Sequence, residues 1–191
     1  MTRCTSRTAI LTLVLSLALL LCGCQAGGGV LILPDVPAKD SAQGKAQLLA
    51  AMNQQYYISY DSSDPSYFIY GSDSAAEAGL AYLQDTCGDD ASKVVSLLSD
   101  STTDDTSPVR CADELLARCP ALSGKPCKIS YAELDSDSLE GADFASAAQM
   151  LLKHRKFLVL PDDSSKADCC QVSFAVGTIG GQAFVIAVFT S

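Results

Sequence analysis

The chain has 191 residues, of which 22 are acidic and 13 are basic, and its net charge at neutral pH is −9. Such acidity excludes proteins that hold nucleic acid or anionic lipid through basic charge, so we expect no nucleic-acid partner. The length is sufficient for one domain with a sizeable core. With one histidine and no tryptophan, the chain has few of the residues that are typical of a catalytic or sugar-stacking cleft.

The first residues have the layout of an export signal. A short start contains Arg3 and Arg7 and no acid, an almost unbroken apolar run follows, and Leu21-Cys22-Gly23-Cys24 closes it. This layout resembles the signal peptides of bacterial lipoproteins, in which a lipobox precedes a cysteine that receives diacylglycerol. The resemblance implies that residues 1–23 are removed and that Cys24 is the lipidated first residue of the mature chain.

The mature chain is expected to be anchored by lipid alone. The apolar run is too short for a membrane span, which needs about 20 residues. Loss of the signal takes two of the 13 basic residues, which leaves 11 against 22 acidic ones, a net charge of −11. Attachment through basic charge is therefore excluded, and acyl chains are the expected anchor.

Residues 24–38 are predicted to be the lipidated cysteine and a flexible tether, because they contain Gly27-Gly28-Gly29 and two prolines. Within the lipoprotein family, a residue other than Asp after the lipidated cysteine implies transfer to the outer membrane. Gln25 occupies that position. We therefore expect the periplasmic face of the cell envelope, and the outer membrane in preference to the inner one.

Residues 39–191 are expected to form one α+β domain. Apolar residues at helical spacing predict a helix over 39–55. Two aromatic segments, Tyr56–Tyr60 and Ser66–Tyr70, flank a turn-forming Asp-Ser-Ser-Asp-Pro sequence and predict a β-hairpin. Ser74 and Glu77 have the spacing of a capping box, which predicts a second helix that ends at Gly88.

The rest of the chain is predicted to form three more helices and four strands. Further helices are predicted over Asp90–Leu98, from Ser107-Pro108 to Pro120, and over Gly141–Leu152. Strands are predicted over Lys128–Tyr131, Phe157–Leu160, Cys170–Val176 and Ala183–Phe189. The last two form a hairpin around Gly177–Gly181, in which Val172, Phe174 and Val176 face Phe184, Ile186 and Val188. The predicted fold is α+β: an antiparallel sheet of about five strands, with the N-terminal hairpin beside the C-terminal strands, packed against helices.

The segment from Gly180 to Thr190 resembles the closing strands of serine β-lactamases and penicillin-binding transpeptidases, and the Tyr56–Tyr70 hairpin with its capped helix resembles their opening. The resemblance implies that the two hairpins lie side by side in one sheet. The catalytic motifs of that family, S-x-x-K, S-D-N and K-T-G, are absent from the chain. What is implied is therefore a fold without that serine chemistry.

Six cysteines remain beyond the lipidated one: Cys87, Cys111, Cys119, Cys127, Cys169 and Cys170. An even number in an exported chain predicts disulfides, because these persist in the periplasm, but sequence does not choose among the pairings. The adjacent Cys169 and Cys170 are expected to bond different partners. No zinc site or other metal or cofactor is expected, because the chain has no C-x-x-C pair in this part.

The sequence also contains residues that suggest two kinds of chemistry. A thiol enzyme would use His154, the only histidine, with Cys170 or Cys87 as nucleophile. Against it, paired cysteines leave no thiol, and His154 with its basic neighbours complements a helix C-terminus. The Asp135-Ser136-Asp137 sequence suggests a calcium loop, but Ser146 stands where the bidentate carboxylate is needed, so helix capping is the better explanation.

The binding candidates are five tyrosines that fall close together: Tyr56, Tyr57, Tyr60, Tyr67 and Tyr70. Tyrosine suits protein or glycan partners through its flat ring and hydroxyl group, although it is also an ordinary strand former. The predicted function is a non-enzymatic binding or assembly module of the bacterial envelope. The alternatives are an envelope hydrolase, either related to serine hydrolases or a thiol enzyme, and an inhibitor or immunity protein against an envelope-directed enzyme.

Overall fold

A five-stranded sheet in the order β1-β4-β5-β2-β3 organises the protein. The structure is a computed structural model and describes residues 42–60, 66–98, 109, 112–159 and 169–191. The strands are β1 (Ile69–Tyr70), β2 (Cys127–Leu134), β3 (Lys156–Val159), β4 (Gln171–Ile179) and β5 (Gln182–Thr190). Neighbouring strands are antiparallel except β1 and β4, which are parallel. The predicted α+β class with about five strands is confirmed, with a sheet that is mixed and mostly antiparallel.

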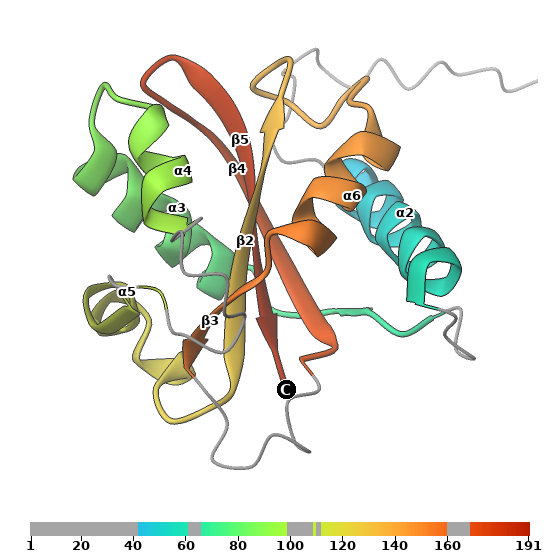
Figure 1. The fold of residues 1–191 in the computed structure, drawn as a ribbon, viewed down its shortest axis with the longest axis horizontal. Coiled ribbons are helices and arrows are strands. Elements are labelled where there is room, and N and C mark those ends of the chain that lie inside the picture. Colours follow the sequence, from blue (N-terminus) through green and yellow to red (C-terminus); the bar gives the residue numbers. More distant parts are fainter. Residues whose placement is uncertain (1–41, 61–65, 99–108, 110–111, 160–168) are drawn as a thin grey trace, which may run out of the picture. The chain divides into compact units, whose positions relative to one another are not determined.

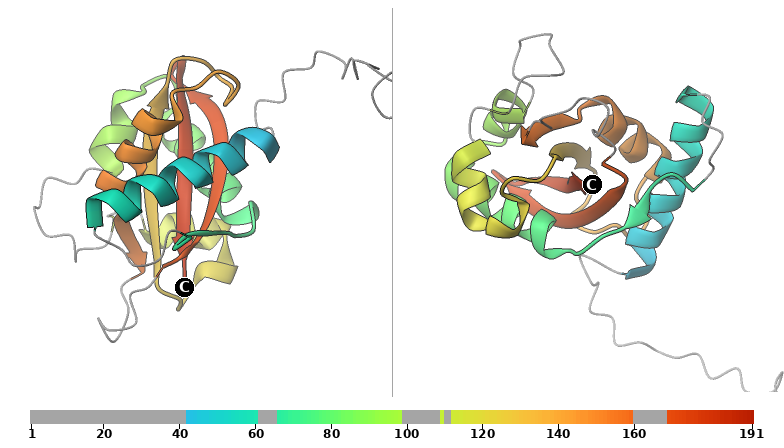
Figure 2. Two further views of the ribbon diagram at one scale, coloured as in Figure 1. Left: turned by 90° about the vertical axis from the view of Figure 1, so that its right-hand side faces the viewer. Right: turned by 90° about the horizontal axis from the view of Figure 1, so that it is seen from below.

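Helices cover both faces of the sheet (Figure 1). On one face lie α2 (Ala42–Tyr60) and α6 (Phe144–Lys153), and on the other lie α3 (Ser74–Cys87), α4 (Ser92–Leu98) and α5 (Ala112–Arg118). Two further views show α2 and α6 side by side on their face (Figure 2). A short 3-10 helix, Pro120–Leu122, leads from α5 toward β2. The helices predicted within residues 74–98 and 141–152 are therefore confirmed to within a few residues.

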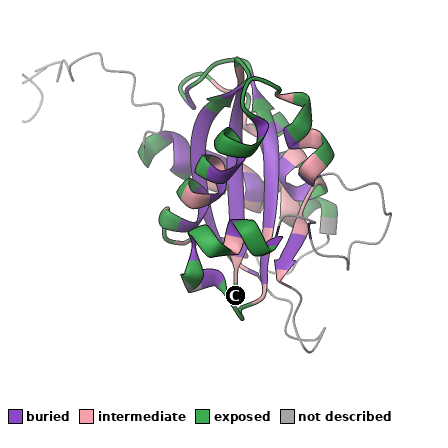
Figure 3. Ribbon diagram, turned by 90° about the vertical axis from the view of Figure 1, so that its left-hand side faces the viewer, coloured by how far each residue is buried: buried purple, intermediate pink, exposed green. Residues whose placement is uncertain are grey.

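Each face of the sheet has its own hydrophobic core. In β5, Ala183, Val185, Ala187 and Phe189 face α2 and α6, whereas Phe184, Ile186 and Val188 face α3. Residues 183–189 are all buried, and the strands stand out as the buried centre of the ribbon (Figure 3). A strand that is covered on both faces is apolar at every position and not only at alternate ones, which explains the long apolar run in the sequence.

The predicted hairpin of β4 and β5 exists, but its predicted facing pairs are wrong. The turn consists of Gly180 and Gly181 alone, with φ values of 56° and 78°, as a two-residue hairpin turn requires. This turn pairs Val172 with Phe189, Phe174 with Ala187 and Val176 with Val185. A register change of one residue moves side chains to the other face. Phe184, Ile186 and Val188 therefore lie on the face opposite to Val172, Phe174 and Val176.

The predicted N-terminal hairpin is wrong. Tyr56–Tyr60 continue α2, and among the residues described between α2 and α3 the only strand is the two-residue β1. Packing explains the difference, because the Tyr56 ring stacks on Tyr67 with centroids 4.4 Å apart and meets Phe68 edge-on at 5.1 Å. This contact holds the end of the helix against the chain that leads into β1. The feature that resembled the opening strands of β-lactamases is thus a helix followed by a short parallel edge strand.

The predicted capping of two helices also needs correction. Asp73, and not Ser74, is the residue before α3, and its side chain makes no capping hydrogen bond. For α6 the cap is Asp143, whose carboxylate accepts from the backbone N–H groups of Ala145 and Ser146, each at 3.1 Å. The hydrogen bond from the Ser146 hydroxyl lowers the pKa of Asp143, and these two backbone bonds lower it further. The Asp135–Asp137 sequence lies earlier, in the loop after β2. The predicted start at Ser107-Pro108 is outside the described residues.

Candidate functional site

The five candidate tyrosines do not form one binding surface. Tyr56 and Tyr67 are half-buried and stacked on each other, so they pack the inside of the protein. Tyr57 is exposed on α2, and the Tyr60 side chain is outside the described residues. Tyr70 is 42% exposed on β1. Tyr70 lines a cavity that also contains charged side chains.

Arg155 completes the packing around Tyr56. Its guanidinium carbon lies 5.8 Å from the ring centre of Tyr56, 5.9 Å from that of Phe68 and 5.8 Å from that of Phe189. Its Nε donates to the carbonyl oxygen of Leu152 at 3.2 Å, near the C-terminus of α6. The cation therefore both contacts the aromatic rings and satisfies a helix-end carbonyl, which agrees with the predicted role of the basic residues there.

A buried charge lies at the other end of α2. Lys45 is only 5% exposed, and its Nζ forms an ion pair of 3.0 Å with Oδ2 of Asp73. The Tyr70 hydroxyl donates to Oδ1 of the same carboxylate at 2.5 Å. The Asp73 carboxylate thus makes these contacts with α2 and β1 and does not cap α3.

These three side chains line a cavity of about 310 Å³. Its other walls are Ala42, Ala46 and Leu49 of α2. The cavity, which we call the Lys45 pocket, has an apolar wall along about two turns of α2 and an ammonium, a carboxylate and a phenol at its polar end. Such a combination of apolar lining with a few fixed polar groups is typical of small-molecule sites, which start at about 300 Å³.

Lys45 and Asp73 are not among the site residues that the sequence predicts. A signal was present for Lys45, since it precedes the buried Leu48 by three residues and the buried Met52 by seven, which places it on the apolar stripe of the helix. A lysine on such a stripe must find a partner or reach water. Asp73 carried no comparable signal, because an acidic residue before a helix is ordinarily a cap.

The three candidate residues of a thiol enzyme lie on different elements. His154 ends α6 and stacks on Tyr131 with centroids 5.5 Å apart. Burial lowers the pKa of His154, and the positive charges of Lys153 and Lys156 lower it further. Cys87 is the last residue of α3 and its side chain lies in the core, and Cys170 lies just before β4, where its carbonyl oxygen accepts from the Ile69 N–H.

No disulfide joins any two of the five cysteines that the structure describes, which are Cys87, Cys119, Cys127, Cys169 and Cys170. Cys111 is outside the described residues, so the pairing of all six stays a prediction. Cys127 is fully buried, and its burial raises the pKa of its thiol to about 12. The neighbouring thiols of Cys169 and Cys119 add to this rise.

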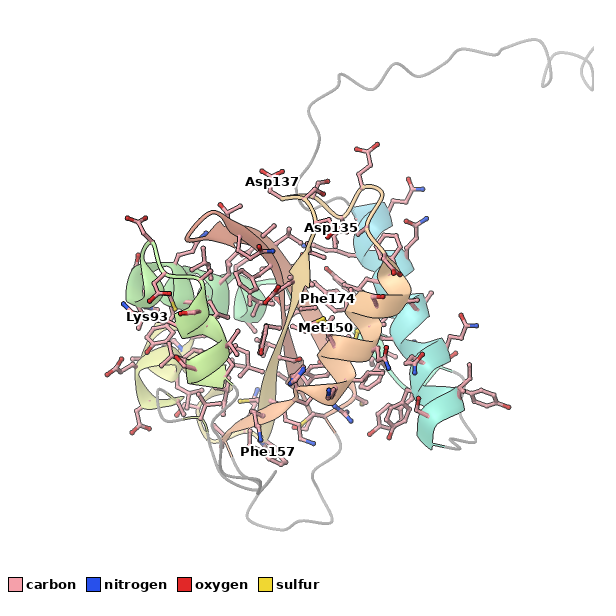
Figure 4. The ribbon with its side chains drawn as sticks, turned by 45° about the horizontal axis from the view of Figure 1, so that its top comes forward. Lys93, Asp135, Asp137, Met150, Phe157 and Phe174 are labelled. Atoms are coloured by element: carbon pink, nitrogen blue, oxygen red, sulfur yellow. The ribbon has the colours of Figure 1, made fainter. Side chains whose placement is uncertain are left out.

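A second, more polar cavity of about 450 Å³ lies beside the turn of β4 and β5. Asp135 and Asp137 line it and extend from the loop after β2 (Figure 4). Among the described residues no three His, Cys, Asp or Glu side chains are placed to hold a metal ion. The acidic loop therefore shows no arrangement for calcium in the part of the chain that the structure covers.

The comparisons with known proteins give no relative. No family model, no curated protein and no solved structure matches the chain. Within the described residues, no helix has both the length and the apolar character that crossing a membrane demands. The signal residues, Cys24 and the predicted tether all lie outside those residues.

Proposed function

We propose that this chain is a lipid-anchored binding module of the bacterial cell envelope that holds a small zwitterion with an apolar side group in the Lys45 pocket. The anchor is supported by the resemblance of residues 1–24 to lipoprotein signals. The binding role is supported by one observation above all, the buried Lys45–Asp73 ion pair at the wall of a cavity. The ligand chemistry follows from the sign and position of the lining groups.

The energetic cost of the pair supports a binding role. Burying an ammonium is expensive, and well-packed apolar residues of similar volume are often at least as stabilising as a buried ion pair. A fold that needed only stability at this position would be served by a larger apolar side chain. Here a charged pair lies beside open space, with Asp73 in contact with two different elements. Held rigidly in this way, its charges are available to orient a polar ligand.

The ligand class follows from the same groups. The Lys45 ammonium can donate to a carboxylate, and the Asp73 carboxylate can accept from an ammonium. Ala42, Ala46 and Leu49 offer an apolar surface for a short hydrocarbon. A free amino acid with an aliphatic side chain carries all three features and fits a cavity of about 310 Å³.

Isothermal titration of the purified full chain with three matched probes tests this. Leucine carries both charges, 4-methylpentanoate lacks the ammonium, and isoamylamine lacks the carboxylate. We expect leucine to bind at least about tenfold more tightly than either of the others, since each loses one charge-assisted hydrogen bond. Equal or absent binding of all three probes would remove the proposal.

Variants identify the site. Lys45→Met keeps the length of the side chain and removes the charge. It should abolish the preference for leucine over 4-methylpentanoate and isoamylamine. Lys93→Met is the matched control, because Lys93 is exposed on α4, far along the chain from the pocket (Figure 4). Leu49→Phe narrows the cavity and leaves the ion pair untouched, so it should weaken binding while the circular dichroism spectrum stays that of the parent. Unchanged binding in both pocket variants would place the ligand elsewhere.

The anchor has an independent test. Growth with radiolabelled palmitate should label the parent chain and the Cys22→Ser variant, because only Cys24 is expected to carry lipid. Cys24→Ser should carry no label and should be recovered in the soluble fraction and not with the membranes. Label retained by Cys24→Ser would refute the lipoprotein prediction and leave the pocket proposal unaffected.

A further inference from the structure

Three cysteines lie close together at one end of the sheet. Cys127 begins β2 and is fully buried, Cys169 lies two residues before β4 and is 4% exposed, and Cys119 precedes the short 3-10 helix. The register brings the first two together, because Cys127 and Gln171 are both paired with Thr190 of β5, one from each side. The start of β2 and the start of β4 are therefore neighbours of the same residue.

One contact limits the distance between Cys169 and Cys127. The Cys169 thiol donates to the carbonyl oxygen of Pro126 at 3.6 Å. That oxygen belongs to the peptide bond that leads into Cys127, so standard bond lengths place it roughly 3 Å from the Cys127 Cα. The Cys169 sulfur is thus within about 6.5 Å of that Cα, so side-chain rotation with a small backbone adjustment can bring the two sulfurs to bonding distance.

We propose that Cys127 and Cys169 form a disulfide when the chain folds under oxidising conditions. Cys119 is the competing thiol, since it lies in the same core cluster as Cys127, whereas Cys169 belongs to the cluster on the other face of the sheet and meets Cys127 at the sheet's end. The thiol of Cys169 has the larger effect on the Cys127 pKa and that of Cys119 the smaller, which agrees with Cys169 as the partner. The proposal concerns residues outside the Lys45 pocket and does not depend on its ligand.

The reaction is thiol–disulfide exchange with a disulfide oxidant such as oxidised glutathione or an oxidoreductase. The Cys169 thiolate attacks one sulfur of the oxidant and releases the other as a thiolate, which gives a mixed disulfide. The Cys127 thiolate then attacks the Cys169 sulfur and releases the second thiolate. Two protons leave the protein thiols, two electrons pass to the oxidant, and two oxidant thiols result.

The burial of Cys127 determines when the disulfide can form. In the folded protein the Cys127 thiol is fully buried, and its pKa of about 12 leaves almost no thiolate near neutral pH. The bond must therefore form during folding, before β2 and β4 close around it. Once formed, it holds the residues next to Cys170, whose carbonyl oxygen anchors β1 through the Ile69 N–H at 2.9 Å.

Peptide mapping of the full chain tests the proposal. The chain is refolded in a glutathione redox buffer, which makes the result independent of export, then alkylated, digested without reduction and analysed by mass spectrometry. We expect a linked peptide pair that contains Cys127 and Cys169 and disappears on reduction. A Cys119–Cys127 pair, or alkylated Cys127 in the unfolded non-reduced protein, would overturn it.

Stability measurements add a second readout. A disulfide that closes a loop of this length typically changes the unfolding equilibrium constant by about 30-fold to about 900-fold. Cys127→Ser, Cys169→Ser and the double variant should each lose this factor, and the double variant should lose no more than a single one. The loss should vanish when the parent is reduced, and Cys170→Ser should show none. Additive losses that persist under reduction would indicate packing and not a bond.

Discussion

The side chain of Asn53 on α2 makes two hydrogen bonds with the backbone of Phe68. Its Oδ1 accepts from the Phe68 N–H at 2.7 Å, and its Nδ2 donates to the Phe68 carbonyl oxygen at 2.9 Å. The side-chain amide therefore makes the two backbone hydrogen bonds with Phe68 that a neighbouring strand would make, at the point where the chain enters β1. Because Phe68 is 1% exposed, these two backbone groups have little access to water.

Asn53→Ala should destabilise the protein by about 2 to 4 kcal/mol, because two buried backbone groups lose their partner. Asn53→Asp should cost less, since it still accepts from the Phe68 N–H. The exposed neighbour Gln54→Ala serves as the control and should change stability by less than about 0.5 kcal/mol. Urea denaturation measures all three, and equal midpoints for Asn53→Ala and Gln54→Ala would contradict the assigned role.

The two turn glycines should differ in their tolerance of alanine. Both have positive φ, but a Cβ on Gly180 would come within 2.6 Å of the Ala91 backbone nitrogen and 2.7 Å of the Asp89 oxygen, whereas one on Gly181 meets nothing within 4 Å. Gly181→Ala should cost about 1 to 2 kcal/mol for its backbone conformation alone. Gly180→Ala should cost about 1 to 3 kcal/mol more. Thermal unfolding measures the difference, and similar melting temperatures would refute the close approach of the turn to the α3–α4 connection.

His154 should titrate below its ordinary pKa of 6.5, because burial and the charges of Lys153 and Lys156 disfavour the proton. As the only histidine, it gives a ring proton signal in an NMR titration that needs no assignment. Lys153→Gln should raise this pKa, and the distant Lys93→Gln should leave it unchanged. The unfolded chain binds the proton more readily, so this residue lowers stability as the pH falls below about 6.5. A titration midpoint at or above 6.5 would contradict this environment.

In the reduced protein, Cys127 should make stability fall at high pH. Its thiol keeps its proton up to a pKa of about 12, whereas in the unfolded chain it ionises near 9.0. Between these values the unfolded state binds fewer protons, so the free energy of unfolding drops by up to about 1.4 kcal/mol per pH unit. Denaturation at several pH values above 9 should show a smaller drop in Cys127→Ala than in Cys119→Ala. Equal slopes would show that Cys127 is not the group responsible.

Local patterns predicted the elements whose packing agrees with their propensity. α6 has a clear apolar stripe in Ala147, Ala148 and Leu151, all of which are buried. β4 and β5 have β-branched and aromatic residues with glycines between them. β2 was predicted at half its length, because Ala132, Glu133 and Leu134 are weak strand formers that pairing with β5 nevertheless keeps extended.

The failures share a physical cause, which is that tertiary contacts outweigh local preference. Tyr56 and its neighbours favour strands by propensity, yet the stacking on Tyr67 and the Asn53 bonds to Phe68 suit a helix that runs on to Tyr60. The Lys45 pocket could not be predicted from the sequence for a similar reason. Lys45 and Asp73 are 28 residues apart, and only the folded chain brings them together.

The place of β5 in the sheet has a consequence for synthesis on the ribosome. Of the described strands β5 is the last to be made, and it lies between β4 and β2. Until residues 182–190 have emerged, the edge of β2 that pairs with β5 has no partner. The apolar side chains of both cores also stay partly exposed. The nascent chain therefore cannot complete this sheet before β5 has been made, and until then it must be kept from aggregating.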